Sequence, residues 1–381
     1  MTDTLVTPPA ETEPRIRLKH HLLELDDGHE VGVSVGGRGV PLVFMHGLAL
    51  SRRAYLRMLS RIAGLGFLVI ALDAAGHGDT HNLPGDAGEL ADRVDLTLRT
   101  LDALGVAQAV FAGHSMGGRM AIQLAAAAPG RVLAAVLFDA AAGASFDEAV
   151  PSALGSPRRA ARTLLGMVLD THRDPSRLGG VERSRYLRML ASVAVGNARR
   201  PGGLTGAARA IMQSGDYTPL LHTMRDHKIP TMVLHGEKDL IVPFDSARDI
   251  ADDADATLYK VPGAYHSWMI VNPRHGADAL RQLLDGELGE ALRNAARTFG
   301  IRDWRDAAEW DVALVAQDAW IRELNGEIIE ELGVEEADHV EMELVRRASR
   351  PEPARRMPWM RRTYRRRVVR RPKSRPDTSV A

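Results

Sequence analysis

The sequence contains no cysteine among its 381 residues. This absence excludes disulfide bonds, thiolate metal sites and a cysteine nucleophile. The sequence also has no apolar run near the roughly 20 residues that a membrane-spanning helix requires. At the N-terminus, acids and prolines occupy the stretch MTDTLVTPPAETEPR, where a secretory signal peptide would carry a basic segment and an apolar core. We therefore expect a cytoplasmic protein.

Net charge is also absent, because 49 basic and 49 acidic residues cancel. Near the C-terminus, however, acidic and basic residues are concentrated in separate segments. Residues 302–343 contain fourteen acids and three arginines, whereas residues 351–381 contain ten arginines and one lysine against two acids. The overall composition, with 45% apolar and 26% charged residues, is typical of a soluble globular protein. The two charged blocks therefore need an explanation separate from the rest of the chain.

Strand-like and helix-like segments alternate over most of the first 140 residues. Residues 20–37 predict a hairpin around the turn DDGH, and VPLVFMHG (40–47) is an apolar run typical of a strand covered on both faces. The later strand-like runs FLVIALDAAGHG, AQAVFAGHS and RVLAAVLFDA each follow a segment with helical spacing. Because strands that alternate with helices form right-handed crossovers, the pattern predicts an α/β fold with a mostly parallel sheet flanked by helices.

The alternation stops between residues 141 and 226, where arginine-rich helical segments follow one another, and it then resumes at IPTMVLHGEKD. We therefore expect a core of residues 15–140 and 227–295, interrupted by a helical cap of residues 141–226. Residues 1–14 are polar and contain prolines, which indicates a disordered lead-in. Residues 296–350 predict an acidic helical extension, and residues 351–381 a basic tail that we expect to be disordered.

The pattern G-x-S-x-G occurs twice, around Ser34 and around Ser115. A serine hydroxyl is a poor nucleophile unless a base takes its proton and pre-set N–H donors stabilise the oxyanion. Ser115 ends the strand AQAVFAGH and begins the helix MGGRMAIQLA, which places it on a sharp turn at the carboxyl end of a strand. Ser34 lies in mid-strand among alternating valines. We therefore predict Ser115 as the nucleophile and interpret Ser34 as an ordinary strand serine.

Two backbone N–H groups are candidates for an oxyanion hole. The N–H of Met116 lies at the start of a helix, where free donors and the helix dipole favour negative charge. The second candidate is the N–H of Leu48, because His46-Gly47 turns the chain directly after the strand VPLVFM. Taken alone, His-Gly is a simple β–α turn, and its place before the first core helix is what supports the functional interpretation.

A carboxylate and a histidine follow at the ends of later strands. Asp239 lies in the loop after IPTMVLHGEKD, with Glu237 and Asp139 as its competitors. His266 follows the strand TLYKVPG, 27 residues after Asp239, whereas His77 in DAAGHGDT belongs to a structural turn. We predict Asp239 as the acid that orients His266, and His266 as the general base. The chain order is then Ser, Asp, His.

The chain resembles the α/β-hydrolase superfamily in five segments. These are FMHG (44–47), LDAAGHG (72–78), AGHSMGG (112–118), LHGEKDLIVP (234–243) and GAYHSW (263–268). Each is weak alone, but all five occur in the family's order, and the resemblance covers residues 20–295. It implies a helical cap, with Ser115 as nucleophile, His266 as general acid/base, Asp239 as its orienting carboxylate, and the N–H groups of Leu48 and Met116 as the oxyanion hole. It implies no metal or organic cofactor.

The activity that the resemblance implies is a serine hydrolase that cleaves a small-molecule carboxylic ester through an acyl-enzyme on Ser115. Relatives that dehalogenate alkanes or open epoxides use an aspartate where this chain has Ser115, and dienelactone hydrolases use a cysteine, so those branches are excluded. A lactone or C–C bond hydrolase stays open as an alternative, as do the cofactor-free perhydrolase-like members. A non-catalytic binding protein is the alternative from another class; such proteins usually lose a triad member, and this chain keeps all three.

The charged C-terminal blocks suggest partners that the hydrolase resemblance does not address. The basic run Arg355–Arg375, with Trp359 and Tyr364 interleaved, is of the kind that contacts nucleic-acid phosphates or an anionic membrane surface. A solvated tail that pairs with the acidic segment is the alternative. The helical spacing of Trp310 and Leu314 predicts a helix docked on the core or on a second copy of the chain, which would make a homo-oligomer.

Overall fold

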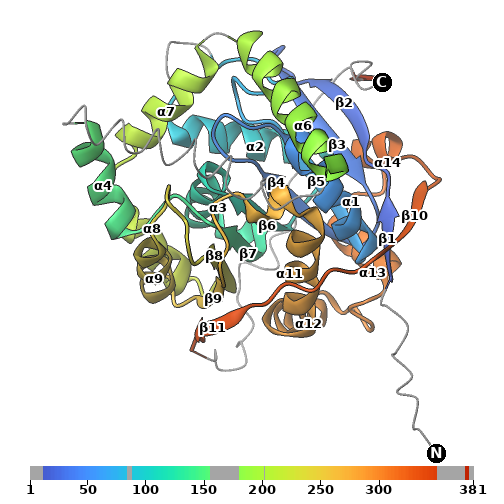
Figure 1. Ribbon diagram of the computed structural model, residues 1–381. Helices are drawn as coiled ribbons and strands as arrows, with labels where there is room; N and C mark the ends of the chain where they lie inside the picture. The colour runs from blue at the N-terminus through green and yellow to red at the C-terminus, as the bar shows by residue number, and fades with distance from the viewer. Residues whose placement is uncertain (1–11, 84–87, 155–179, 201, 350–373, 377–381) are drawn as a thin grey trace, which may run out of the picture.

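The computed structural model describes residues 12–83, 88–154, 180–200, 202–349 and 374–376. The centre of the fold is one ten-stranded sheet with helices on both faces (Figure 1). In the ranges that the structure describes, no helix combines the length and the apolar character that a bilayer crossing requires. The α/β architecture predicted from the alternation of strands and helices is confirmed.

The parallel part of the sheet lies at its centre. In spatial order, the strands are β11 (Glu343–Arg346), β9 (Thr257–Val261), β8 (Thr231–Gly236), β7 (Val132–Phe138), β6 (Ala109–His114), β4 (Val40–Met45), β5 (Phe67–Leu72), β3 (Glu30–Gly36), β2 (Lys19–Glu24) and β12 (Ser374–Pro376). The strands from β9 to β5 in this order run parallel to one another, and the flanking pairs are antiparallel. The carboxyl ends of the parallel strands therefore meet at one end of the sheet, which is where ligands bind in such folds.

Alternate residues of the central strands enter two separate apolar cores. Val43 and Phe111 face one core with α2 (Leu90–Leu104), α3 (Met116–Ala127), α8 (Thr218–Asp226), α9 (Phe244–Asp253) and α14 (Trp320–Asn325). Phe44 and Val110 face the other, with η1 (Arg52–Tyr55), α1 (Leu56–Gly64), α10 (Trp268–Val271), α11 (Pro273–Asp285), α12 (Glu287–Phe299) and α13 (Ala307–Leu314). Both faces of these strands are covered, which is why the strands read as continuous apolar runs rather than as alternating ones.

Only helices occur in the described part of the segment predicted as a cap. They are α4 (Ala144–Leu154), α6 (Gly180–Ala198), α7 (Gly203–Gln213) and α8. On α6, Val193 is buried against the core while Leu187 is 51% exposed, so the apolar residues of this helix do not share one environment. The apolar residues Leu164, Leu165, Met167 and Val168 of the predicted cap lie outside the described residues.

The C-terminal extension differs from the helical segment that we predicted. After the short helices α13 and α14, residues 331–336 form strand β10 (Glu331–Glu336) and residues 343–346 form β11. β10 pairs with β1 (Thr12–Ile16), so the first strand begins inside the range 1–14 that we interpreted as a disordered lead-in. Most of the predicted basic tail lies outside the described residues, but Ser374–Pro376 form β12 on β2. Pairing with distant strand edges stabilises these segments, and helical spacing cannot reveal such partners.

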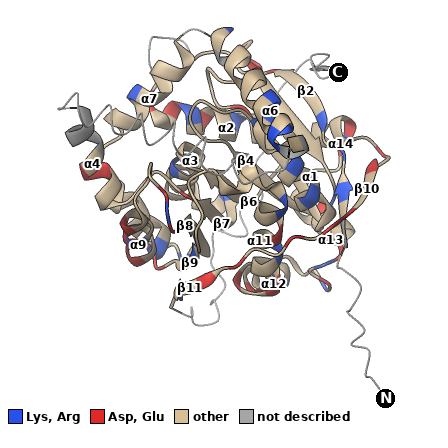
Figure 2. Cartoon of the chain, viewed as in Figure 1, with Lys and Arg blue, Asp and Glu red and all other residues tan. Residues whose placement is uncertain are grey.

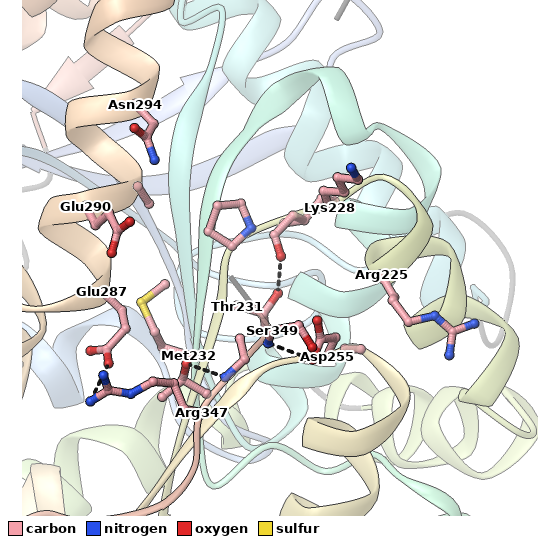
Figure 3. A pocket seen from close by; sticks show the side chains of 16 residues that line it. Arg225, Lys228, Thr231, Met232, Asp255, Glu287, Glu290, Asn294, Arg347 and Ser349 are labelled. Carbon is pink, nitrogen blue, oxygen red and sulfur yellow. Dashed lines mark hydrogen bonds and ion pairs between the residues drawn. The ribbon is translucent and has the colours of Figure 1, made fainter. Parts of the chain in front are cut away.

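Charged residues of one sign are concentrated in two of the described segments. In Figure 2, acidic residues (red) follow one another along the segment from β10 to β11, and basic residues (blue) along α6. A cavity of about 450 Å3 lies at the amino ends of β8 and β9, between α12 and residues 347–349 (Figure 3). Its charged lining is balanced, with Arg225, Lys228 and Arg347 against Asp255, Glu287 and Glu290.

Candidate active site

Ser115 occupies a strained turn between β6 and α3. Its backbone has φ 54° and ψ −115°, a conformation that side chains beyond glycine rarely adopt, and the residue is 8% exposed. The flanking glycines permit the turn, since a Cβ on Gly113 would lie 2.2 Å from the carbonyl oxygen of Gly117. A Cβ on Gly117 would lie 2.1 Å from the carbonyl oxygen of Met45. At Ser115, the G-x-S-x-G spacing is therefore a steric requirement.

Ser34, in the competing motif, lies within β3 as predicted. It is fully buried, and its Oγ accepts a hydrogen bond from Arg52 Nε at 2.9 Å and pairs with His20 Nδ1 at 2.7 Å. The hydroxyl thus connects a hairpin strand to a buried arginine. The same five-letter pattern therefore serves packing in β3 and a strained turn after β6.

The two predicted oxyanion donors lie in loops that touch each other. Met116 is the first residue of α3, where a backbone N–H has no acceptor within its own helix. Leu48 follows Gly47 at the end of β4, and a Cβ on Gly47 would lie 3.4 Å from Ser115 Cβ. The turn that carries Leu48 therefore packs directly against Ser115. Glycine at position 47 permits this close approach, because a Cβ there would also lie 2.9 Å from His114 Nδ1.

His46 fixes the turn that carries Leu48. Its Nδ1–H donates to the carbonyl oxygen of Gly47 at 2.8 Å, and its Nε2 accepts from the N–H of Ala74 at 2.9 Å. Burial lowers the pKa of His46 to about 4. The imidazole is therefore neutral near pH 7, which its hydrogen bonds require, because Nε2 must keep its lone pair to accept from Ala74.

Asp239 and His266 form a direct hydrogen bond. Asp239 Oδ2 lies 2.7 Å from His266 Nδ1, and both side chains are almost fully buried. The other carboxylate oxygen, Oδ1, accepts from the N–H groups of Ile241 at 2.8 Å and Val242 at 2.9 Å. Burial raises the pKa of Asp239, but the charge and hydrogen bond of His266 outweigh burial and hold this pKa below its usual value. Asp239 is therefore an ionised acceptor for an Nδ1–H on His266.

The two competing carboxylates bond elsewhere. Asp139, at the end of β7, accepts from the Gly236 N–H and from Trp268 Nε1, both at 2.8 Å. Burial first, and then the nearby charge of Asp239, raises the pKa of Asp139 well above its usual value. Glu237 is exposed and accepts from the N–H of Gly263 at 2.9 Å. Of the three candidates, Asp239 is the carboxylate whose hydrogen bond orients His266.

A buried chain of hydrogen bonds connects the loops around Ser115. The Gly47 N–H donates to Tyr55 Oη at 3.2 Å, the Tyr55 hydroxyl donates to His114 Nδ1 at 2.7 Å, and His114 Nε2 donates to the His266 carbonyl oxygen at 2.9 Å. These directions follow from the carbonyl group, which can only accept, so His114 Nε2 carries the proton and Nδ1 accepts. Burial lowers the pKa of His114 to about 3 and raises that of Tyr55. Both groups therefore stay neutral, and the chain keeps its direction at neutral pH.

Tyr55 and His114 are the residues that sequence reasoning missed at this site. His114 precedes Ser115 in the motif, and its ring centroid lies 4.7 Å from that of His266. Tyr55 enters the site from η1, 59 residues earlier than His114. No local pattern pairs a tyrosine in one helix with a histidine at the end of a later strand. The one signal in the sequence is the position of His114, a polar residue directly before Ser115 in the nucleophile motif.

The described residues contain one group that could hold a metal ion, formed by Asp139, His235 and Asp239. Their ligand atoms lie within 4.8 Å of one another. The carboxylate oxygens of both aspartates already accept hydrogen bonds, and His235 Nε2 donates to the Val242 carbonyl oxygen at 2.9 Å. The cluster is thus a hydrogen-bonded support for Asp239 and His266, and we assign no ion to it.

The sequence profile of the alpha/beta hydrolase fold family matches residues 40–273. The chain belongs to this family. A protein of Mycobacterium phage D29 that carries the name non-heme haloperoxidase is 42% identical over 269 residues, covering 69% of this chain and 94% of that protein. The monoacylglycerol lipase of Mycolicibacterium smegmatis is 28% identical over 245 residues, covering 60% of this chain and 81% of the lipase.

Solved structures share the hydrolase fold of this chain. The structure of Est816, described as an N-acyl homoserine lactone degrading enzyme, matches with a TM-score of 0.56 at 24% identity, over 68% of this chain and 99% of Est816. Likeness at this identity concerns the fold. Together with the sequence relatives, it supports a hydrolase that acts on a small molecule. The family profile ends at residue 273, so it does not account for the C-terminal extension of this hydrolase.

Proposed function

We propose that this protein is a serine hydrolase that cleaves a carboxylic ester through an acyl-enzyme on Ser115. The observation that carries the proposal is the hydrogen bond of 2.7 Å between Asp239 Oδ2 and His266 Nδ1, held beside the strained turn of Ser115. Because His114 both precedes Ser115 and bonds to the His266 backbone, the nucleophile and the base belong to one connected unit. A serine, a histidine and a carboxylate in these roles are sufficient for ester hydrolysis through an acyl-enzyme.

In the first half of the reaction, the Ser115 hydroxyl attacks the ester carbonyl carbon and gives its proton to His266 Nε2. The carbonyl oxygen becomes an oxyanion, for which the N–H groups of Leu48 and Met116 are the donors. Asp239 stays ionised and stabilises the doubly protonated imidazole. The intermediate collapses when His266 gives the proton to the departing alcohol, which leaves the acyl group on Ser115.

In the second half, water attacks the acyl carbon while His266 takes one of its protons. A second oxyanion forms between the same donors. It collapses with return of the proton to Ser115, so that the carboxylic acid leaves and the enzyme is regenerated. All protons move through His266, and no metal or organic cofactor takes part.

A related activity is suggested by the name of the phage relative, a non-heme haloperoxidase. Hydrogen peroxide attacking the acyl group on Ser115 in place of water would release a peroxy acid and free serine. The peroxy acid would then transfer one oxygen atom to a halide ion, which gives a hypohalous acid and returns the carboxylic acid. This second candidate uses the same residues and differs only in the molecule that attacks the acyl-enzyme.

Nitrophenyl esters of increasing acyl length test the proposal. We expect turnover by the wild type, and a loss of at least about 10³-fold in kcat for Ser115→Ala, because the nucleophile and the base act as a unit. A fluorophosphonate should label the wild type and not Ser115→Ala. A wild type that neither labels nor hydrolyses any ester contradicts the proposal. Adding peroxide and bromide, with a dye that is brominated as readout, separates the second candidate from simple hydrolysis.

A further inference from the structure

A second cavity, of about 320 Å3, lies between the core and the C-terminal half of α6. We call it the arginine pocket, after Arg53, Arg199 and Arg200 in its lining. Ser51, three residues after the predicted oxyanion donor Leu48, also lines it, as does Asp79 from the loop after β5. The arginine pocket therefore adjoins the carboxyl ends of β4 and β5, where parallel sheets bind ligands.

The core side of the arginine pocket is internally paired. Buried Arg52 forms an ion pair with Asp73 and also lies 2.8 Å from Asp79 Oδ2. Arg53 Nη2 lies 3.0 Å from the same oxygen of Asp79. These two arginines and two aspartates balance one another. The core side of the arginine pocket thus has no excess charge.

The α6 side of the arginine pocket carries the excess charge. Arg200 Nη2 donates to the backbone carbonyl oxygen of Asp79 at 3.1 Å, which positions the guanidinium without neutralising it. Among the described residues, no acidic side chain forms an ion pair with Arg199 or Arg200. Arg199 and Arg200 therefore line a cavity whose one carboxylate among the described residues, Asp79, already pairs with Arg52 and Arg53. Figure 2 shows several basic residues, in blue, along α6.

The cavity at the amino ends of β8 and β9 provides an internal comparison (Figure 3). Three cationic side chains line it together with three carboxylates, and Arg347 pairs with Glu287 at 3.9 Å. Three arginines line the arginine pocket with a single carboxylate. The charge excess in the arginine pocket is therefore not explained by the abundance of arginine in the sequence. The cavity at the amino ends of β8 and β9 balances its cations with carboxylates, and the arginine pocket does not.

We propose that the arginine pocket binds the oxyanion group, a carboxylate or a phosphate, of a small molecule. A guanidinium presents paired N–H donors in a plane, which match two oxygens of such a group. The hydroxyl groups of Ser51 and Ser192 supply neutral donors in the lining, and Val193 offers an apolar contact to the carbon skeleton. A volume of about 320 Å3 accommodates a small organic acid or a phosphate ester rather than a polymer.

The oxyanion group has two sources that this chemistry does not separate. It belongs to the substrate when an ester carries a second, charged end, and this version rests on the proposed ester hydrolysis. It belongs to an independent small ion when the pocket binds without reference to Ser115. Both versions use Arg199 and Arg200 in the same way, so binding is measured first and kinetics second.

The binding experiment is calorimetric titration of the full-length protein with inorganic phosphate and with glutarate at low salt. The variants are Arg199→Gln, Arg200→Gln and the double variant, with Arg188→Gln on the exposed side of α6 as the matched control. We expect the double variant to weaken binding at least about tenfold, since each charge-assisted hydrogen bond to an oxyanion is strong. Arg188→Gln should change it less than about twofold. Absence of binding to the wild type, or equal binding by the double variant, overturns the proposal.

The kinetic experiment compares the mononitrophenyl ester of glutaric acid with nitrophenyl butyrate. A rise in KM of the double variant for the charged ester alone assigns the oxyanion group to the substrate. Unchanged kinetics for both esters, together with weakened phosphate binding, assigns it to an independent ion. If the wild type hydrolyses neither ester, the proposed function fails while the titration still decides whether the arginine pocket binds anions.

Discussion

The two ends of the central sheet are organised by different forces. At the carboxyl ends of β4, β6 and β9, polar side chains bond to one another across loops, as in the path from Gly47 through Tyr55 and His114 to His266. At the amino ends of β4 and β6, the C-terminal extension buries apolar side chains, including Trp310 and Leu314. The hydrogen bonds at the carboxyl end fix the orientation and the protonation state of the side chains. The apolar side chains at the amino end stabilise the fold because they are removed from water. Substitutions at the two ends should therefore affect different observables.

Asp239→Asn should produce the largest effect at the carboxyl end. The amide presents a donor or a neutral acceptor to His266 Nδ1 and removes the charge that stabilises the imidazolium, so kcat should fall about 10⁴-fold. Asp139→Asn is the matched control, because its carboxylate bonds to Gly236 and Trp268 instead. Ester kinetics measure both variants. A greater loss of kcat in Asp139→Asn than in Asp239→Asn would reverse our assignment of the acid.

Trp310→Ala should produce the largest effect at the amino end, and on stability alone. The Trp310 side chain is 1% exposed, and its removal leaves a cavity that should cost about 3–5 kcal/mol of unfolding free energy. Ester hydrolysis measured at low temperature should stay within about twofold of the wild type. Val312→Ala on the same helix is the control, since Val312 is 77% exposed. Denaturant unfolding provides the measurement. A loss of kcat in Trp310→Ala that is absent from Val312→Ala would contradict the prediction, because it would show that the amino end affects catalysis.

Tyr→Phe substitutions compare the ends with identical chemistry. Tyr55→Phe leaves the Gly47 N–H and His114 Nδ1 without their partner, which should cost about 1–3 kcal/mol of stability. We also expect kcat to fall about tenfold with little change in KM, because the loops around Ser115 lose the hydrogen bonds that hold them in fixed positions relative to one another. Tyr259→Phe removes a hydrogen bond of 2.6 Å to Glu287 beside the amino-end cavity and should leave kcat unchanged. Equal kcat in both variants would reduce Tyr55 to a packing residue.

Acid should weaken the carboxyl end first. Burial lowers the pKa of His46 to about 4 and that of His77 to about 3, so both are neutral in the folded protein and gain protons on unfolding below about pH 6.5. Stability is therefore complete above pH 6.5 and falls as the pH decreases toward these folded values. Each histidine contributes up to about 1.4 kcal/mol per pH unit.

Unfolding free energies measured between pH 7 and pH 5 test this dependence. His77→Phe keeps a ring and should reduce the slope by about one proton. His81→Gln is the control, because the His81 side chain is 44% exposed. An unchanged slope in His77→Phe would mean that other groups cause the acid dependence.

Local steric rules are the reason that much of the carboxyl end could be predicted from the sequence. The glycines around Ser115 are needed by the turn itself, and the predicted strand ends place Asp239 and His266 at the same end of the sheet. The contact between Asp239 and His266 could therefore be predicted from where the two residues lie in the sequence relative to the strands. The contact between Tyr55 and His114 could not be predicted, because it depends on how three loops converge after folding.

The amino end could not be predicted in the same way. Residues 331–336, ELGVEE, contain good helix formers, and the sequence favoured a helix there. They form a strand because β1 offers unpaired backbone groups to β10. The strand conformation of β11 likewise depends on the free edge of β9. Tertiary pairing overrides local propensity in these segments.

The pairing of β1 with β10 has a consequence for synthesis of the chain. Thr12 pairs with Glu336, and the edges of the sheet are completed by β11 and β12, which follow later still. At a ribosomal rate of about 5–20 residues per second, β1 waits on the order of 15–65 s for its partner. During that time, the nascent chain exposes strand edges that can pair with other chains. Products of premature termination would keep those edges permanently, so we expect them to be the species that aggregates and that chaperones must hold.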